Sequence, residues 1–401
     1  MNPSDNDSMP KRLLFKEAIS RRQFLHFMQC MGLGAFIGPI GPMNPLNEHL
    51  LKRLPGRVVH IEDADATSWN FSSGWYGNYI DQGVVDLMVE RGLIKLTGAS
   101  SVAEAWRKLI PHYIAGQTLA IKVNFNNFMG SEPDSNINAV IEPVNAVIGT
   151  LIQFGFSPNE ITVYDVTNGF HAGKMPQINF INRCAYPGVN FVCYYGNPDP
   201  FSATEKVSFD CPPPPKPQIA DVAICNALAN SDYLINMPLI KAHPYGYVTL
   251  GFKHHFGSVN RCDTIHTYLP NSSQYVADYS PLVDLMKNPH FGAKTVLTVG
   301  DGLFGNWKNV SGSPLRWLTF GNTAPNSLFF SADKVAIDSL MSDLIDFERR
   351  QQGFGILNLK ARDYLKIAEQ EGMGVFEQGD PWQLPRGSGY RLIRYVYVNG
   401  V

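Results

Sequence analysis

The sequence predicts an α/β protein whose sheet is largely parallel and doubly wound, with helices on both faces and with insertions. Two observations support this fold class. Short runs rich in β-branched and aromatic residues alternate along the chain with longer segments of helical periodicity. The strand–helix–strand spacing is that of βαβ units, which build parallel sheets. We therefore expect a single α/β domain over residues 57–401, after a separate N-terminal segment over residues 1–50.

The first part of the domain has regular patterns for both element types. The β-rich runs predict strands, and apolar residues at helical spacing predict helices. A glycine at position 155 is expected to end the longest of these helices. The expected strands are 58–61, 118–126, 160–166 and 189–195, and the expected helices are 83–91, 102–112 and 137–154.

The same alternation resumes after a proline run at 212–215. A strand at 295–299 is followed by Gly-Asp-Gly at 300–302, which predicts an abrupt turn. Asp333 is expected to cap the helix that follows it, whereas Asp338 is expected to face either the ligand crevice or solvent. The remaining expected elements are helices at 220–229, 247–256, 333–351 and 359–370, and strands at 233–240, 327–330 and 390–398, the last at an edge of the sheet.

Composition restricts the classes of partner. The chain has 401 residues, a formal net charge of -2 and 17% charged residues, so no nucleic-acid partner is indicated. A small molecule or another protein is the natural partner. The six cysteines form no C-x-x-C pair, which argues against a zinc ribbon or a bacterial ferredoxin cluster. Scattered buried cysteines and one or two disulfides are both compatible with their spacing.

Residues 1–50 have the layout of an export signal. Basic residues precede the pair Arg21 and Arg22, and the weakly apolar stretch 24–40 contains no acidic residue. This order predicts a twin-arginine (Tat) signal, so we expect the Tat export machinery as a partner and a periplasmic or extracytoplasmic location. The stretch is too short and too rich in Gly and Pro to form a stable membrane-spanning helix, and no stable transmembrane segment is expected beyond it. An amphipathic N-terminal helix is the alternative.

Polar residues cluster where the expected strands end. In open α/β sheets, ligands bind beyond the carboxyl ends of the strands. Each of these residues alone is an ordinary loop start, but their concentration at one predicted edge indicates a shared site. In chain order they are Lys122, Asn124, Asp165, Asn236, Lys241, His243 and Asp301.

The densest stretch is 236–257, with the sequence NMPLIKAHPYGYVTLGFKHHFG. Lys241 and His243 follow the expected strand, and the expected helix at 247–256 places Thr249 and Lys253 on one face. A helix start beside two lysines and a histidine suits a small anion such as a phosphate or a carboxylate. The positive end of the helix and the ammonium groups then act together.

A metal site is the alternative use of the same region. His243, His255 and Asp301 are the expected ligands of a divalent metal. His254 and His255 would point about 100° apart on a helix, so they are not expected to ligate one ion together. The full set of available donors is His243, His254, His255, His266, Asp263 and Asp301.

The motifs around these residues resemble the domain-of-unknown-function-362 family. The resemblance covers roughly 109–347 and leaves a C-terminal extension over 348–401. The activity of the family is generally unassigned, and some members carry a pair of four-iron ferredoxin clusters whose cysteines are absent here. The chain also departs from the family at His254, where Asn usually follows the lysine. The matching motifs are 121–124, 155–165, 234–243, 248–253, 256–257, 299–302 and 332–338.

The leading hypothesis is an exported enzyme that binds a small anionic substrate at the carboxyl edge of the sheet. His243, Lys241 and Lys253 are the expected catalytic residues, with His243 as the acid or base because its ordinary pKa lies near neutrality. A metal- or redox-linked periplasmic accessory protein and a non-catalytic binding module are the alternatives, and the cofactor stays open. The expected substrate-binding residues are Lys122, Asn124, Asn236, Thr249 and Asp165.

Overall fold

The computed structural model describes residues 54–401 except 168–173, 196–198 and 310. The described residues belong to one compact unit. The segment that carries the expected twin-arginine signal lies outside them. Among the described residues, no helix is both long enough and apolar enough to cross a membrane.

Ten strands of the described chain form the central sheet. Its main path runs in the order β12-β1-β11-β10-β7-β2-β3-β4, with β8 paired to β10 and β9 paired to β8. The strands are β1 (Arg57–Glu62), β2 (Leu119–Lys122), β3 (Ile161–Asp165), β4 (Asn190–Cys193), β7 (Tyr233–Asn236), β8 (Leu239–His243), β9 (Tyr247–Thr249), β10 (Thr295–Asn306), β11 (Ser327–Ser331) and β12 (Arg394–Asn399).

Most pairings in this sheet are parallel, as the sequence predicts. The strands β10, β7, β2, β3 and β4 run parallel to one another, and β12 runs parallel to β1 at the edge. The strand β11 is antiparallel to both of its neighbours. A separate antiparallel pair consists of β5 (Phe201–Val207) and β6 (Val222–Cys225). The carboxyl ends of β2, β3 and β7 therefore lie at one edge.

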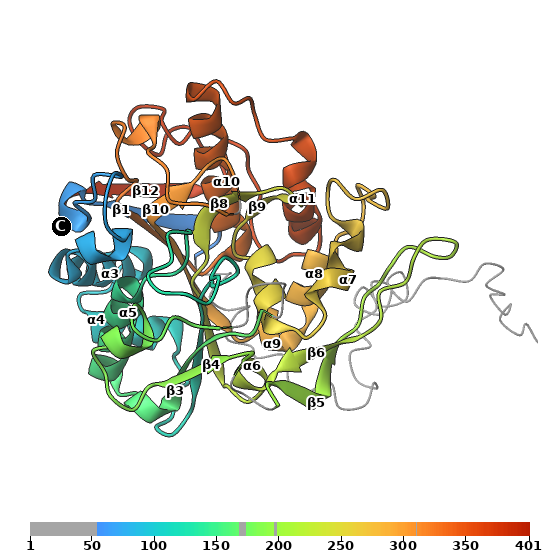
Figure 1. The fold of residues 1–401 in the computed structure, drawn as a ribbon, viewed down its shortest axis with the longest axis horizontal. Helices are drawn as coiled ribbons and strands as arrows, with labels where there is room; N and C mark the ends of the chain where they lie inside the picture. Colours follow the sequence, from blue (N-terminus) through green and yellow to red (C-terminus); the bar gives the residue numbers. More distant parts are fainter. Residues whose placement is uncertain (1–53, 168–173, 196–198, 310) are drawn as a thin grey trace, which may run out of the picture. The chain divides into compact units, whose positions relative to one another are not determined.

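Helices cover both faces of the sheet, which confirms the doubly wound prediction (Figure 1). Successive strand residues point to opposite faces, so Ile121 of β2 joins one hydrophobic core and Ala120 joins the other. The first core includes α3 (Gln82–Thr97), α4 (Val102–Leu109) and α5 (Ile141–Phe154). The second includes α8 (Pro281–Lys287), α9 (Pro289–Gly292), α10 (Lys334–Gln351) and α11 (Asp363–Gln370).

Local signals account for the ends of the long helices. Asp81 caps α3 by accepting the N–H of Val84, and Gly98 ends it in the left-handed conformation at φ 63°. Asp333 caps α10 by accepting the N–H groups of Val335 and Ala336, which confirms the expected N-cap. Of these two caps, the sequence predicted the one at Asp333.

Three expected elements are wrong. Residues 220–229 form strand β6 and then the short helix α6 (Asn226–Ala229), because the apolar alternation of β6 pairs with β5. The expected strand 233–240 is divided into β7 and β8 around Pro238, which has no N–H for the ladder. The expected helix 247–256 is strand β9 followed by a 3-10 turn over Lys253–Ser258.

The expected turn at 300–302 is also absent, because β10 continues through it to Asn306. The two glycines instead allow neighbouring elements to pack closely against β10. A Cβ atom on Gly300 would lie 2.6 Å from Sδ of Met341, and one on Gly302 would lie 2.9 Å from Cε2 of Phe329. Glycine at these positions lets α10 and β11 approach β10 closely.

The five cysteines within the described residues are all free. The structure therefore contains no disulfide among Cys184, Cys193, Cys211, Cys225 and Cys262. The cysteines of this part of the chain are thus scattered and without a disulfide, but only Cys225 is buried as expected, and the other four are partly exposed.

Candidate functional site

The carboxyl ends of β2, β3 and β7 bring several of the expected site residues together. Lys122 ends β2 and is the register partner of Tyr164 in β3 and of Asn236 in β7. The strand β8 leaves this edge alongside β10 and carries Lys241 and His243. The strand β9 then returns antiparallel to β8, with Thr249 opposite Lys241. The short turn over Lys253–Ser258 closes the site.

Lys122 lies at the bottom of this site in a sealed ion pair. Its Nζ is 3.5 Å from Oδ2 of Asp165 and donates to the carbonyl oxygen of Val123 at 2.6 Å. Burial lowers the pKa of Lys122, and the charge of Asp165 opposes this effect. The backbone of Gly257 covers the pair so closely that a Cβ atom there would lie 2.8 Å from Nζ. Lys122 is therefore placed to support the site from below.

Lys241 is fully buried and begins a chain of hydrogen bonds. Its Nζ donates to Oδ1 of Asn124 at 2.9 Å. Nδ2 of Asn124 donates to Nδ1 of His254 at 3.2 Å, and Nε2 of His254 donates to the carbonyl oxygen of Lys122 at 3.1 Å. Since a carbonyl only accepts, it fixes the tautomer of His254 and, through it, the orientation of the Asn124 amide. Burial, followed by the charge of Lys253, lowers the pKa of Lys241 to about 7.

Lys253 lies between two histidines. Its Nζ is 3.1 Å from Nε2 of His243 and 3.5 Å from Nε2 of His266. Burial lowers the pKa of Lys253 to about 7. Burial is also the main reason why the pKa of His266 falls to about 4 and that of His243 falls well below its ordinary value. Both imidazoles are therefore neutral at neutral pH.

The hydrogen bonds determine which nitrogen carries the proton in each neutral ring. Nδ1 of His243 accepts the backbone N–H of Tyr245 at 2.9 Å, so the ring proton is on Nε2 and points at Lys253. Nδ1 of His266 lies 2.9 Å from the carbonyl oxygen of Cys262 and must donate to it, so its Nε2 accepts. An ammonium could not accept from His243. Lys253 is therefore a neutral amine in this arrangement.

Two of the expected substrate-binding residues present buried polar atoms without a partner. Oδ1 of Asn236 and Oγ1 of Thr249 make no hydrogen bond, although these residues are only 1% and 4% exposed. Nδ2 of Asn236 donates to the carbonyl oxygen of Gly251, two residues after Thr249. Buried polar groups of this kind ordinarily have a partner. Thr249 and Lys253 do not share a helix face as expected, because they lie on a strand and on the turn after it.

Asp338 of α10 holds the segment that joins β9 to the turn of Lys253. Its Oδ1 accepts the N–H of Gly251 at 2.8 Å, and its Oδ2 accepts the N–H of Phe252 and the hydroxyl of Tyr364, both at 3.1 Å. Burial raises the pKa of Asp338 to about 7. This aspartate faces the back of the site rather than solvent, so it positions the site residues from the second core.

The structure does not assemble the expected metal ligands into one site. Among the residues that it describes, no group of three His, Cys, Asp or Glu side chains is arranged to hold a metal ion. Nδ1 of His255 lies 3.2 Å from the hydroxyl of Ser258, and its ring packs edge-on against Phe291. The electrostatic neighbours of Asp301 are Tyr76 and Glu142, and its Oδ1 accepts the N–H of Leu303. These contacts separate Asp301 from the lysines.

Sequence reasoning missed three contributors to this site. His266 was expected only as a metal donor, but it contacts the Lys253 amine. Gly257 seals the Lys122–Asp165 pair, and Asp338 supports the turn from 87 residues away in the chain. Two features of the sequence indicated these residues. One is the Phe-Gly dipeptide that follows the two histidines, and the other is the acidic residue within an apolar helix. Their partners are distant in the chain, so their roles needed the fold.

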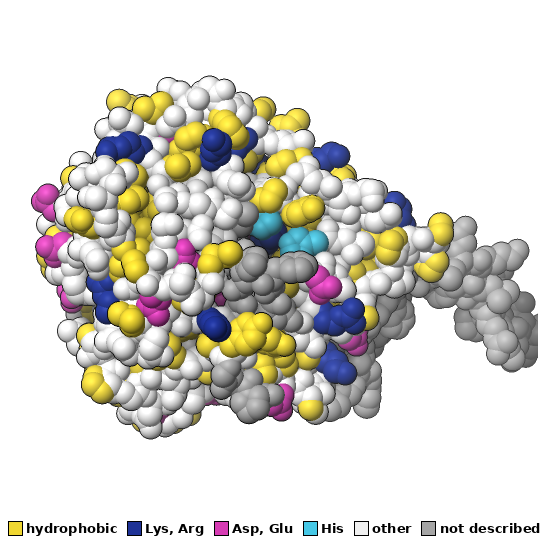
Figure 2. Space-filling view, viewed as in Figure 1, with side chains coloured by type: hydrophobic (Ala, Val, Ile, Leu, Met, Phe, Trp, Pro, Cys, Tyr) yellow, Lys and Arg dark blue, Asp and Glu magenta, His cyan; other side chains and the backbone are white. Residues whose placement is uncertain are grey.

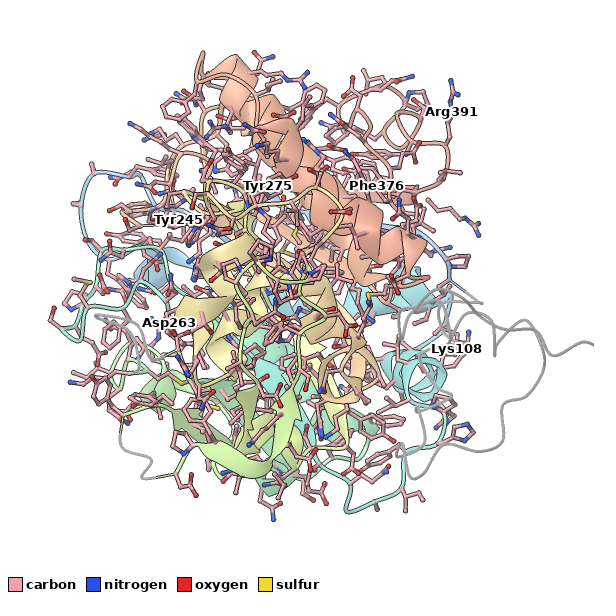
Figure 3. The ribbon with its side chains drawn as sticks, turned by 90° about the vertical axis from the view of Figure 1, so that its right-hand side faces the viewer. Lys108, Tyr245, Asp263, Tyr275, Phe376 and Arg391 are labelled. Carbon is pink, nitrogen blue, oxygen red and sulfur yellow. The ribbon has the colours of Figure 1, made fainter. Side chains whose placement is uncertain are left out.

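Figure 2 shows histidine side chains at the surface, beside a Lys or Arg side chain and below hydrophobic ones. Figure 3 places Tyr245 and Asp263 along the same side of the molecule, opposite Lys108 and Arg391. Tyr245 is 49% exposed and follows His243 by two residues.

A groove elsewhere in the described structure contains none of the expected site residues. It is a groove of about 700 Å³ between the loop after β1 and the loop after β10. Its walls are mainly aromatic, and Arg316 stacks on one of the rings at 4.6 Å. The groove is lined by, among others, Trp69, Phe71, Trp75, Tyr76, Trp307 and Arg316. The chemistry predicted from the sequence is thus concentrated elsewhere, at β8 and β9.

Comparison with known families identifies the family to which the chain belongs. A family described as a domain of unknown function (DUF362) matches residues 119–343, more than half of the chain. The chain belongs to the DUF362 family. The match runs from β2 to α10, so it contains the site residues from Lys122 to Asp338. A comparison with curated proteins finds no match.

The DUF362 match covers the site segments but assigns no reaction to them. The matched region includes both buried amines, Lys241 and Lys253, and the two histidines that contact Lys253. It ends inside α10, so α11 and β12 lie beyond it. The function of this DUF362 protein has to be argued from the side chains themselves.

Proposed function

We propose that this DUF362 protein is an enzyme that binds a small anionic substrate between Lys241 and Lys253. The observation that carries the proposal is a pair of buried amines without a counterion. Within the described part of the chain, the polar contacts of Lys241 and Lys253 are to an amide oxygen and to imidazole nitrogens, not to carboxylates. By contrast, Lys122 has Asp165 as its partner.

An anion would remove the electrostatic cost of this arrangement. Burying an ammonium without a partner costs several kcal/mol, and here the cost appears as the lowered pKa of both lysines. An anion about 4 Å from an ammonium contributes about 4 kcal/mol at an effective dielectric constant of about 20. Anion binding would therefore raise the pKa of Lys241 and be accompanied by proton uptake at neutral pH.

The neighbouring groups suit a small, partly polar substrate. Asn124 and His254 hold the Lys241 amine in one position through their hydrogen bonds. The partnerless oxygens of Asn236 and Thr249 offer an acceptor and a hydroxyl to the ligand. His243 carries a proton on Nε2 beside Lys253, where it can donate to a substrate oxygen.

Thermal unfolding in the presence of small anions tests the proposal. Pyruvate, malonate and inorganic phosphate are added separately at constant ionic strength. A binding anion stabilises the folded protein by about 2.7 kcal/mol at roughly 100 times its Kd. Lys241→Met should abolish this gain, whereas Lys366→Met, at a side chain 49% exposed, should keep it. The proposal is wrong if the gain survives in Lys241→Met or if none of the three anions stabilises the wild type.

We also propose that the protein is exported by the Tat route to the periplasm or another extracytoplasmic space. Support comes from the order of Arg21, Arg22 and the apolar stretch after them. Changing both arginines to lysine keeps the charge and should leave the protein in the cytoplasmic fraction. An unchanged distribution between fractions would contradict export by this route.

A further inference from the structure

We propose that Lys253 is an amine nucleophile that forms a Schiff base with the carbonyl group of a small anionic aldehyde or ketone, such as a 2-oxo acid. The inference rests on the proposed function, because Lys241 has to hold the anionic group of the same substrate. It adds the substrate class and the reacting atom.

The first argument is the direction of the hydrogen bond between His243 and Lys253. The N–H of Tyr245 occupies Nδ1 of His243, so the ring presents a donor to Nζ at 3.1 Å. A Lys253 ammonium would place two donors against each other. The arrangement therefore selects the free amine, which is the nucleophilic form of lysine.

The second argument is the base on the other side of the amine. Nδ1 of His266 donates to the carbonyl oxygen of Cys262, which leaves Nε2 as an acceptor 3.5 Å from Nζ. Lys253 thus has a donor on one side and an acceptor on the other. A substrate carbonyl that replaces the 3.1 Å contact between His243 and Lys253 would receive the Nε2 proton of His243 as a hydrogen bond and expose its carbon to Nζ.

The third argument is the environment of the lysine side chain. Its methylene stem packs near Gly246, where a Cβ atom would lie 3.6 Å from Cδ. The ring of Phe256 lies 4.7 Å from Nζ, and the residue is 6% exposed. The titratable groups around Nζ are His243, His266, Lys241 and Cys262. Burial lowers the pKa of Lys253 and the charge of Cys262 opposes this effect, so burial is what favours the unprotonated amine.

The proposed step balances as follows. Nζ of Lys253 attacks the carbonyl carbon, a C–N bond forms, and the π electrons of the carbonyl move to its oxygen. Nε2 of His266 takes a proton from the nitrogen and returns it to that oxygen, giving a carbinolamine. With one further proton from solvent, the hydroxyl leaves as water and the protonated imine remains. Overall, one carbonyl, one amine and one proton give one imine and one water, with no oxidant or reductant.

Reductive trapping tests the inference on the full-length protein. The protein is incubated with pyruvate and sodium cyanoborohydride, and the modified peptides are identified by mass spectrometry. We expect one adduct per chain at Lys253, with the added mass of one pyruvate less one oxygen atom. Propionate has the same carboxylate without a carbonyl and serves as the matched ligand control. The exposed Lys108 and Lys366 report non-specific modification.

The outcomes separate this inference from the anion-binding proposal. An adduct at Lys253 that exceeds those at Lys108 and Lys366 at least tenfold supports the inference. Equal modification of the three lysines, or an adduct confined to Lys241, overturns it. If pyruvate and propionate both stabilise the fold but no adduct forms at Lys253, the inference falls and anion binding stands. If neither acid stabilises the fold and no adduct forms, the inference falls, and anion binding falls with it only if malonate and phosphate also fail to stabilise the fold. Because Lys253 is mapped in the wild type, no variant has to fold.

Discussion

Oδ1 of Asp338 accepts the backbone N–H of Gly251 at 2.8 Å, although 87 residues separate the two in the chain. The same carboxylate accepts the N–H of Phe252 and the hydroxyl of Tyr364. Lys253 follows immediately after this anchored segment. The helix α10 therefore determines where the Lys253 amine lies, even though α10 itself contributes no atom to the open side of the site.

Asp338→Asn should weaken this anchor. An asparagine offers one acceptor oxygen in place of two, so at least one backbone N–H loses its charged partner. Hydrogen bonds to charged groups contribute about 1.5–3 kcal/mol, and we expect a loss of that size in the free energy of unfolding. Urea denaturation at about pH 8 measures it. Asp221→Asn, at an exposed position, should change stability by no more than about 0.5 kcal/mol; equal effects of the two substitutions would contradict the anchoring role.

Gly257→Ala should disrupt the base of the site. The added Cβ would lie 2.3 Å from Oδ1 of Asp165 and 2.8 Å from Nζ of Lys122, so the buried ion pair has to move. Overpacking of this kind costs about 1–3 kcal/mol. Chemical denaturation gives the loss directly. The comparison is Gly83→Ala at the start of α3, where the added Cβ meets a single side-chain atom, at 3.3 Å. A Gly257→Ala protein as stable as Gly83→Ala would show that the pair is not tightly covered.

Lys241→Met should change the pH dependence of stability. In the folded protein burial lowers the pKa of Lys241 to about 7, whereas the ordinary value is 10.5. Between these values the unfolded chain binds more protons, so the wild type gains stability as the pH rises. The variant lacks this contribution, so at about pH 7 its free energy of unfolding should be raised relative to that of the wild type. This difference should shrink by about 1 kcal/mol per pH unit between about pH 7 and about pH 9.

Measuring the free energy of unfolding of both proteins across this pH range tests the direction in which their difference changes. A constant difference between Lys241→Met and the wild type would mean that Lys241 keeps its ordinary pKa in the folded state. Lys366→Met, at an exposed amine, is the matched control and should follow the wild type at every pH. A difference that grows with pH would have the opposite sign and would rule out a buried Lys241 amine that lacks a carboxylate partner.

His254→Phe should be more destabilising than His254→Asn. The histidine links the Asn124 amide to the carbonyl oxygen of Lys122. Phenylalanine leaves the Asn124 amide buried without its acceptor, whereas the Lys122 carbonyl loses one donor and keeps the N–H of Met237 at 2.9 Å. Such a loss costs about 1–3 kcal/mol. Asparagine keeps one donor and one acceptor, and its smaller side chain lets it restore part of the link. Thermal melts of the three proteins give the order, and a His254→Phe melting temperature above that of His254→Asn would contradict it.

Much of the fold could be predicted because its signals are local. The strands at β2 and β3 and the helix α10 follow from short β-rich runs and from the N-cap at Asp333. The segment 247–256 was misassigned because its apolar residues fit a helical period, whereas antiparallel pairing with β8 makes Tyr247–Thr249 a strand. Tertiary pairing of this kind overrides local propensity, and no local feature of 247–256 predicts this pairing.

The candidate site was only partly predictable for a related reason. The rule that ligands bind beyond the carboxyl ends of parallel strands correctly placed Lys122, Asn124, Asp165 and Asn236 near one another. The rule could not predict that Lys122 is enclosed with a carboxylate partner whereas Lys241 has none, because the enclosure depends on the backbone of Gly257. Asp301 was grouped with them because Gly-Asp-Gly resembles a turn, yet β10 continues through it.

The cover over Lys122 is held by a backbone hydrogen bond from Val166 N–H to the carbonyl oxygen of Gly257, at 2.9 Å. Water reaches the ammonium from this side when that bond opens. The exchange rate of the Val166 amide hydrogen with deuterium therefore measures how often the buried charge is solvated. An occupied site and an empty one can then be compared at a single amide, without a substitution and without knowledge of the reaction.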